Sequence, residues 1–122
     1  MPYFFYPGGA PVALTFGGHI EILSSSASAK TFTASAIGVA SDDRYVAACL
    51  GWVSAAAQTP TSVTIGGVTA TQVAPQATAT TVFASTVVYI ANVKTGATAD
   101  VILTLSGAAL YWFCNTYSLT GT

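Results

Sequence analysis

Charged side chains are scarce in this sequence of 122 residues. Only 6% of the residues are charged, with three Lys or Arg and four Asp or Glu, and the net charge is −1. Proteins that bind nucleic acids neutralise phosphates with many basic side chains, so this composition argues against that class. Disordered chains combine high charge with low hydrophobicity, whereas hydrophobic residues make up 52% here. The sequence therefore predicts a folded domain. Its low charge indicates a surface that partners cover, or else a secreted or capsid-type protein whose polar surface is rich in Ser and Thr.

Long hydrophobic runs are also missing. A membrane-spanning helix needs about 18 or more apolar residues in a row, and Gly, Thr and Ser interrupt the apolar stretches here. The start of the chain, MPYFFYPGGAPVALTFGG, is apolar but lacks the basic region of a signal peptide and contains Pro and Gly. We therefore expect no membrane partner, and synthesis in a cytoplasm without export.

Residues suited to catalysis or metal binding are few. His19 is the only histidine, and no G-x-S-x-G motif marks a nucleophilic serine that would act with it. Asp42 and Asp43 are adjacent, so in an extended segment their carboxyl groups would point to opposite faces and not across one cleft. One His, two Cys and four carboxylates show no metal-ligand spacing. The sequence predicts no catalysis, no metal site and no cofactor.

Two cysteines, Cys49 and Cys114, lie in the two most apolar segments of the chain. In immunoglobulin domains such a pair bridges the two sheets beside a tryptophan, and Trp52 and Trp112 lie near these cysteines. However, Trp52 follows Cys49 by only three residues, which differs from the immunoglobulin spacing. A protein made in the cytoplasm also starts with reduced thiols. At the level of sequence, a disulfide and two free thiols both stay open.

The sequence does contain many short β-branched and aromatic segments separated by turn residues. Gly66-Gly67 joins two β-branched runs and predicts a hairpin with a type I′ or II′ turn. Seven or eight short strands predict an all-β fold, a single-domain β-sandwich of immunoglobulin-like or jelly-roll type. The segments expected to form strands are 12–23 (one or two strands around Gly17-Gly18), 31–37, 44–54, 62–73, 81–93, 100–105 before Gly107, and 109–119.

The N-terminal part of the chain differs in composition from the rest. We divide the chain into residues 1–30, an extended arm with short strands, and residues 31–122, the β-sandwich domain. Residues 1–11 carry three prolines and two glycines among aromatic side chains, which predicts extended chain and not helix. Residues 24–30, SSSASAK, have the composition of a linker.

Five residues are candidates for contact with a partner. Tyr3, Phe4, Phe5 and Tyr6 would be poorly accommodated in water alone. They either fold back on their own domain or form an arm that docks on a neighbour, and we favour the arm. Arg44 follows two aspartates at the start of a strand, where we expect a local ion pair or a turn clamp and keep partner contact as an alternative.

An aromatic segment, ALYWFCNTYSL, lies near the C-terminus. Because side chains alternate along a strand, Tyr111, Phe113 and Tyr117 share one side, and Trp112 and Cys114 share the other. One set is expected to fill the core while the other faces a neighbouring strand or subunit. The alternative is a sugar-binding face, in which exposed aromatic rings such as those of tryptophan stack on glycans.

Three segments carry a resemblance to a known group of proteins. They are TFTASAIGVASDDRYVAACLGW (31–52), SVTIGGVTATQV (62–73) and VVYIANVKTGATADVILTLSG (87–107). Over residues 31–121 the chain resembles small β-rich proteins of tailed bacteriophages and prophages, of the type found in phages of alphaproteobacteria, that are virion or tail-associated. SVTIGG followed by A-T-x-V is the more specific part. Similar proteins often have V-P-T-G at the third turn, where this chain has Lys94.

The resemblance implies a non-catalytic virion protein made in the host cytoplasm. We expect a capsid decoration or stabilising protein that packs against the major capsid or tail protein and against sister copies, because virion parts are commonly symmetric homo-oligomers. The short chain and its Met1 start favour a stand-alone protein of this kind. The alternative is a tail- or fibre-associated module that binds a carbohydrate or receptor on the host surface. No catalytic residue comes with the resemblance.

Overall fold

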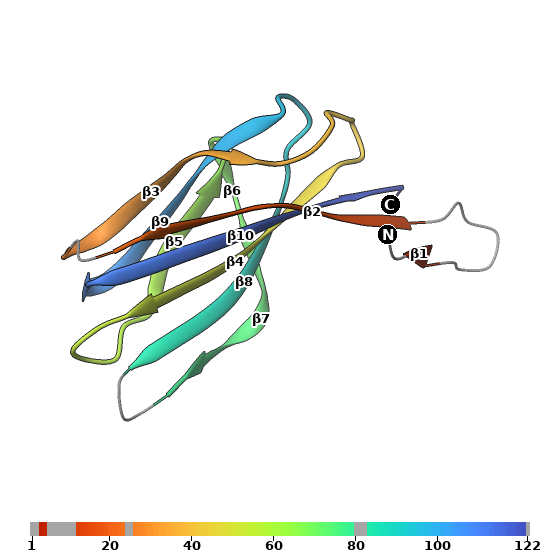
Figure 1. The fold of residues 1–122 in the computed structure, drawn as a ribbon. Helices are drawn as coiled ribbons and strands as arrows, with labels where there is room; N and C mark the ends of the chain where they lie inside the picture. Colours follow the sequence, from red (N-terminus) through yellow and green to blue (C-terminus); the bar gives the residue numbers. More distant parts are fainter. Residues whose placement is uncertain (1–2, 5–11, 24–25, 80–82, 122) are drawn as a thin grey trace.

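The computed structural model describes residues 3–4, 12–23, 26–79 and 83–121 (Figure 1). These residues form strands and turns, and none of them belongs to a helix that could cross a membrane. The strands are β1 (Tyr3–Phe4), β2 (Val12–Ile22), β3 (Ala27–Ala36), β4 (Tyr45–Val53), β5 (Pro60–Ile65), β6 (Val68–Thr69), β7 (Thr71–Thr78), β8 (Ala84–Asn92), β9 (Thr98–Ala109) and β10 (Tyr111–Thr120). The predicted all-β fold is confirmed.

The strands form two antiparallel sheets that pack face to face (Figure 1). The larger sheet has the order β1-β2-β10-β4-β8-β7, and the smaller sheet has the order β3-β9-β5-β6. Strands that follow each other in the chain mostly lie in different sheets, so most neighbours within a sheet are distant in sequence. This arrangement is the predicted single-domain β-sandwich.

The strand order distinguishes between the two sandwich topologies that the sequence left open. In the immunoglobulin fold the last two strands are neighbours in one sheet. Here β9 lies in the smaller sheet and β10 in the larger sheet. The order β2-β10-β4-β8 facing β3-β9-β5-β6 is that of a jelly roll, in which the chain winds between two four-stranded sheets. β1 and β7 are added at the two edges of the larger sheet.

The Gly66-Gly67 hairpin is confirmed. Both glycines have positive φ, 59° and 80°, as a two-residue type I′ turn requires, and the turn pairs Ile65 with Val68. After this hairpin the Ala70 amide donates to the Val63 carbonyl, 2.9 Å away. The chain then continues as β7 in the larger sheet.

Residues 12–22 form one strand, which is one of the two arrangements that the sequence left open, with a bulge at Gly17 where the pairing with β10 shifts by one residue. Two sequence expectations about strand limits are wrong. The linker expected over 24–30 does not hold from Ala27 onward, because β3 begins there and pairs with β9. β9 does not end before Gly107 but continues to Ala109. Gly107 has no side chain, and Gln58 occupies the space beside it, with Oε1 2.5 Å from where a Cβ of residue 107 would lie.

Residues of the predicted N-terminal part pair with the rest of the fold. β2 pairs with β10 from Ala13 to Ile22, so it is a full strand of the larger sheet. Tyr3 and Phe4 form β1, whose backbone pairs with Ala13 and Val12 of β2. At these two positions the backbone folds back on its own chain. Phe5 and Tyr6 lie outside the described residues.

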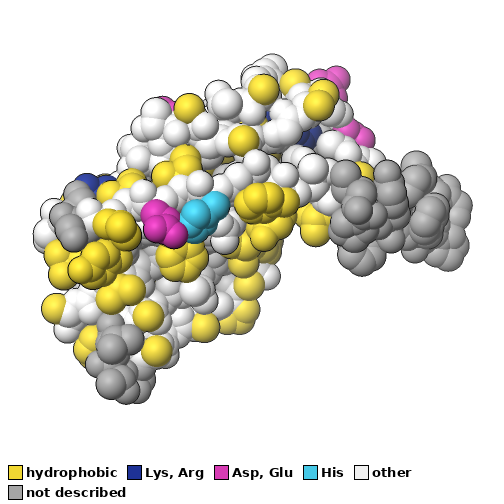
Figure 2. All heavy atoms as spheres, viewed as in Figure 1, with side chains coloured by type: hydrophobic (Ala, Val, Ile, Leu, Met, Phe, Trp, Pro, Cys, Tyr) yellow, Lys and Arg dark blue, Asp and Glu magenta, His cyan; other side chains and the backbone are white. Residues whose placement is uncertain are grey.

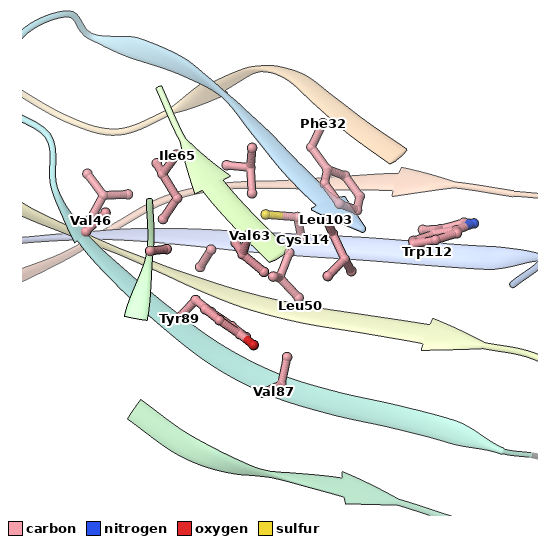
Figure 3. Close-up of a cluster of buried hydrophobic side chains, with 14 of the residues drawn as sticks. Phe32, Val46, Leu50, Val63, Ile65, Val87, Tyr89, Leu103, Trp112 and Cys114 are labelled. Carbon is pink, nitrogen blue, oxygen red and sulfur yellow. The ribbon is translucent and has the colours of Figure 1, made fainter. Parts of the chain in front are cut away.

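The core lies between the two sheets (Figure 3). Phe32, Val63 and Leu103 reach into it from the smaller sheet, and Leu50 and Trp112 reach in from the larger one. Each of these side chains is almost completely buried, and burial of one such side chain contributes about 1.5–3 kcal/mol to folding. Strict alternation along β4, β8 and β10 supplies the inward residues and at the same time creates a second face that points outward.

Candidate functional site

The outward-facing side of the larger sheet is the most distinctive surface of the molecule. Its members alternate with the buried core residues and are paired across neighbouring strands by the sheet register. We call this surface the outer face. It consists of Leu14, Phe16, His19 and Glu21 on β2, Tyr111, Phe113, Asn115, Tyr117 and Leu119 on β10, Tyr45, Ala47, Cys49, Gly51 and Val53 on β4, Thr86, Val88, Ile90 and Asn92 on β8, and Thr71, Ala74 and Ala77 on β7.

The outer face is mainly apolar, whereas the corresponding side of the smaller sheet is mainly polar. The smaller sheet carries Thr31, Ser62, Thr64 and Thr104 outward, with Ile102 among them. This polar exterior is typical of a sheet that faces water. Figure 2 shows hydrophobic side chains grouped around the single histidine of the chain and an acidic side chain next to it. The molecule therefore has one side suited to water and one suited to a partner.

Three aromatic side chains of β10 lie on the outer face. Tyr111 is 43% exposed, and Phe113 and Tyr117 are half-buried, while Trp112 and Cys114 lie in the core. This confirms the predicted division of the aromatic segment. The Phe113 ring lies directly over Gly51, where a Cβ would come within 2.0 Å of its Cζ atom. Only glycine at position 51 leaves space for the ring to lie flat on the sheet.

The tryptophans do not lie on this surface. Trp52 and Trp112 are directly opposite each other on β4 and β10, and both point inward with 1% and 0% exposure. They cannot stack on a sugar, so the expectation that an exposed tryptophan serves a glycan-binding face is wrong. The exposed aromatic residues of the outer face are Phe16, Tyr45 and Tyr111.

His19 belongs to a small polar group within the outer face. Its Nδ1 contacts Asn115 Oδ1 across the β2–β10 pair, and its Nε2 lies 2.9 Å from Glu21 Oε1. The hydrogen bond to Glu21, and then that to Asn115, raises the pKa of His19. Both ring nitrogens are therefore engaged by neighbours within the same face.

The two cysteines lie on opposite sides of one sheet. Cys114 is opposite Leu50, and Cys49 is opposite Asn115, so the cysteines are one register step apart on neighbouring strands. Cys49 points outward and is half-buried, whereas Cys114 points into the core and is 1% exposed. Both thiols are free, which removes the disulfide alternative. Burial raises the pKa of the Cys114 thiol to about 12, so it does not supply a thiolate nucleophile.

Arg44 is a clamp between two loops. It is completely buried, with Nε 2.7 Å from the Val93 carbonyl oxygen and Nη2 2.8 Å from that of Thr95. Nη1 donates to the carbonyls of Gly38 and Gly96 at 3.0 and 2.8 Å, and to Ile37 at 3.4 Å. Burial lowers its pKa, yet an arginine stays charged and needs these acceptors. The turn-clamp interpretation is correct, and partner contact by Arg44 is not compatible with its burial.

An apolar groove lies at the end of the sandwich that Arg44 holds together. It has a volume of about 610 Å³ and is lined by apolar residues and glycines, among them Phe16, Gly17, Val39 and Ala97. No acid, base or nucleophile of a catalytic site lines it. Within the described ranges, no three His, Cys, Asp or Glu residues lie close enough together to hold a metal ion.

Comparisons with known proteins found no match to this chain. No protein-family model, no curated protein and no solved structure matches it. The candidate functional site is therefore inferred from the geometry of this chain alone. That site is the outer face.

Sequence patterns indicated only part of this surface. Alternation along 109–119 placed Tyr111, Phe113 and Tyr117 on one side and Trp112 and Cys114 on the other, but it did not show which side faces the core. The low charge indicated a covered surface. The contributions of Cys49 and Val88 were missed, because they join the aromatic residues only through the pairing of β10 with β4 and of β4 with β8. Register between strands distant in sequence is not visible in the sequence of either strand.

Proposed function

We propose that this chain is a non-catalytic structural protein of a tailed-phage virion, a capsid decoration or stabilising protein that attaches through an apolar surface. The observation that carries the proposal is the contrast between the apolar outer face and the polar side of the smaller sheet. A soluble monomer rarely keeps so large an apolar surface in water, and apolar patches of this kind mark interaction sites.

Two further observations support a structural role. Jelly-roll sandwiches occur in viral shells as well as in lectins, so the fold is compatible with a virion part. The resemblance of residues 31–121 to small virion proteins supplies the biological setting. The partners are then the major capsid or tail protein and sister copies of this chain, and the aromatic residues Tyr3, Phe4, Phe5 and Tyr6 would add contacts of an N-terminal arm.

The test is the presence of the chain in purified particles. Phage particles are induced from a bacterium that carries the gene, separated from soluble protein on a density gradient and analysed by quantitative mass spectrometry. The proposal predicts this chain at a fixed ratio to the major capsid protein, in tailless heads as well as in complete particles. Recovery of the chain only with soluble lysate proteins would rule the proposal out.

The arm has a separate test on the same particles. Particles lacking the gene product are mixed with purified full-length protein or with a version that lacks residues 1–11, and bound protein is measured by co-sedimentation. We expect saturable binding of the full-length protein and weaker binding of the shortened one. Equal binding of both would show that the arm does not attach the protein.

A second candidate is a glycan-binding module, favoured by the exposed rings of Tyr45 and Tyr111 on the outer face. Tyrosine rings stack on sugars and offer a hydroxyl for hydrogen bonding. Calorimetry with purified host surface polysaccharide tests it, with Tyr111→Ala as the probe and Ile102→Ala on the smaller sheet as the control. Binding that Tyr111→Ala abolishes would favour this candidate, and absence of binding would reject it.

A further inference from the structure

The outer face has the size of a protein interface. The five longer strands of the larger sheet, β2, β10, β4, β8 and β7, each contain at least eight residues. With about 4.8 Å between strands and about 3.4 Å per residue, the face measures about 24 by 30 Å, or about 700 Å². A standard stable contact buries about 800 Å² on each partner. One partner of similar extent is therefore enough to cover it.

The few charged side chains on the outer face indicate whether its partner is a different protein or a second copy of this chain. On the described strands of the larger sheet, the only His, Lys, Arg, Asp or Glu side chains are His19 and Glu21, and they bind each other at 2.9 Å. Complementary charge normally guides an interface toward a different protein, and for this purpose the face offers only Glu21, which bonds to His19. For two identical faces, so few charged groups leave little like-charge repulsion to oppose self-association.

The sizes of the side chains also suit a contact between two copies. β4 is the middle one of the five longer strands and carries the small residues Ala47 and Cys49 on the outer face, while Phe113 covers Gly51. Larger residues lie beside them, with Tyr117 opposite Ala47 on β10 and Val88 opposite Cys49 on β8. Packed sheets interdigitate small and large side chains across about 10 Å, and a face that carries both can pack against a copy of itself.

We infer that the outer face is the contact between two copies of this chain, packed face to face about a two-fold axis. The inference rests on the proposed function, because it names a partner for the same surface. Cys49 is the fifth of the nine residues of β4 and thus lies at the centre of the face. Any two-fold axis that lies in the contact plane and passes through this centre brings the two Cys49 residues close together.

The mass of the full-length protein in solution, measured by light scattering over a range of concentrations, tests the inference. We expect twice the mass of the 12.3 kDa chain. Val88→Lys places a charge beside the centre of the face and should weaken the dimer by at least about 100-fold. Ile102→Lys is the matched control, since Ile102 is an exposed apolar residue on the outside of the smaller sheet, and this variant should remain a dimer.

A second readout does not depend on how well Val88→Lys folds. A maleimide should label Cys49 of the wild-type protein more slowly at concentrations at which the dimer forms than in dilute solution, because the second copy covers this side chain. Cys49→Ser, which retains the buried Cys114, shows how much of the labelling is at Cys49. A wild-type monomer at all concentrations, or a dimer in which Cys49 is labelled as fast as in the monomer, overturns the inference. The inference is also overturned if a version that lacks residues 1–11 is a monomer while folded Val88→Lys is still a dimer.

Failure of this inference and failure of the proposed function are separate results. A chain that is monomeric in solution but present in purified particles keeps the virion role and loses the face-to-face dimer. A dimer that protects Cys49 but is absent from particles keeps the contact and removes the virion role.

Discussion

Arg44 shows how a single buried charge can organise several loops. Its guanidinium group gathers carbonyl oxygens from the connection after β3 and from the turn between β8 and β9. These carbonyls have no strand partners at those positions, and the planar group with five N–H donors satisfies several of them at once. The adjacent Asp42 and Asp43 made an ion pair the obvious expectation from sequence. The acceptors are instead backbone carbonyls, some in the connection after β3 and the others in a turn about 50 residues further along the chain.

Replacement of Arg44 tests its role as a clamp. Arg44→Ala should lower the free energy of unfolding by about 3 kcal/mol or more, because several buried carbonyls lose a charged donor. Arg44→Lys should also be destabilising, since an ammonium group cannot reach both loops with the same set of bonds. Urea unfolding followed by the fluorescence of the buried Trp52 and Trp112 measures the change.

Lys94 provides the control for this measurement. It lies exposed in the same turn that Arg44 holds, so Lys94→Ala should change the free energy of unfolding by less than about 0.5 kcal/mol. Equal stabilities of Arg44→Ala and Lys94→Ala would contradict the clamp.

The cysteines show which residue properties the sequence could provide. Alternation predicted correctly that Cys114 points to the same side as Trp112, and hence into the core. It could not show that Cys49 is one register step away on the neighbouring strand and therefore on the other side of the sheet. That fact depends on pairing between segments about 65 residues apart in the chain.

At the level of elements, local signals predicted turns well and strand limits less well. The Gly66-Gly67 hairpin was visible because its turn is a two-residue property with few permitted sequences. β2 was harder, since Gly17-Gly18 resembles a break. Gly17 instead forms a bulge and approaches the smaller sheet, where a Cβ would lie 2.3 Å from the Ala36 carbonyl oxygen. A strand that is bent inward by a bulge has the same local composition as two short strands.

The two glycines of β2 form a matched pair of test positions. Gly17→Ala should lower the free energy of unfolding by about 1–3 kcal/mol, because the added methyl group meets backbone that cannot move away without shifting β3. At Gly18 a Cβ would lie 3.6 Å from the Ala36 Cβ, an ordinary contact, so Gly18→Ala should have little effect or stabilise the strand. Thermal unfolding followed by circular dichroism compares the two, and equal melting temperatures would contradict the close approach at Gly17.

At the level of the whole molecule, the sequence predicted the class of fold but not its topology. Short alternating segments separated by turns are sufficient to indicate a β-sandwich. They do not determine which strands are neighbours, because pairs such as β2 with β10 join the two ends of the chain. The contrast between the apolar and the polar exterior depends on that order, so it became visible only in the assembled sheets.

This contrast explains the unusual composition of the chain. Low charge and high hydrophobicity would leave an isolated monomer poorly protected against non-specific association. If the outer face of one copy covers that of another, the same composition becomes favourable, because the polar side of the smaller sheet then forms much of the remaining surface. The central claim is therefore that the outer face is covered in the functional state.

The reactivity of Cys49 toward a maleimide tests this claim most directly. Cys49 lies at the centre of the outer face, and the buried Cys114 in the same chain is an internal control for folding. The account predicts that Cys49 is protected at high protein concentration and becomes reactive on dilution or in Val88→Lys, while Cys114 stays unreactive throughout. A rate of Cys49 labelling that is the same at every concentration and in both proteins would contradict it.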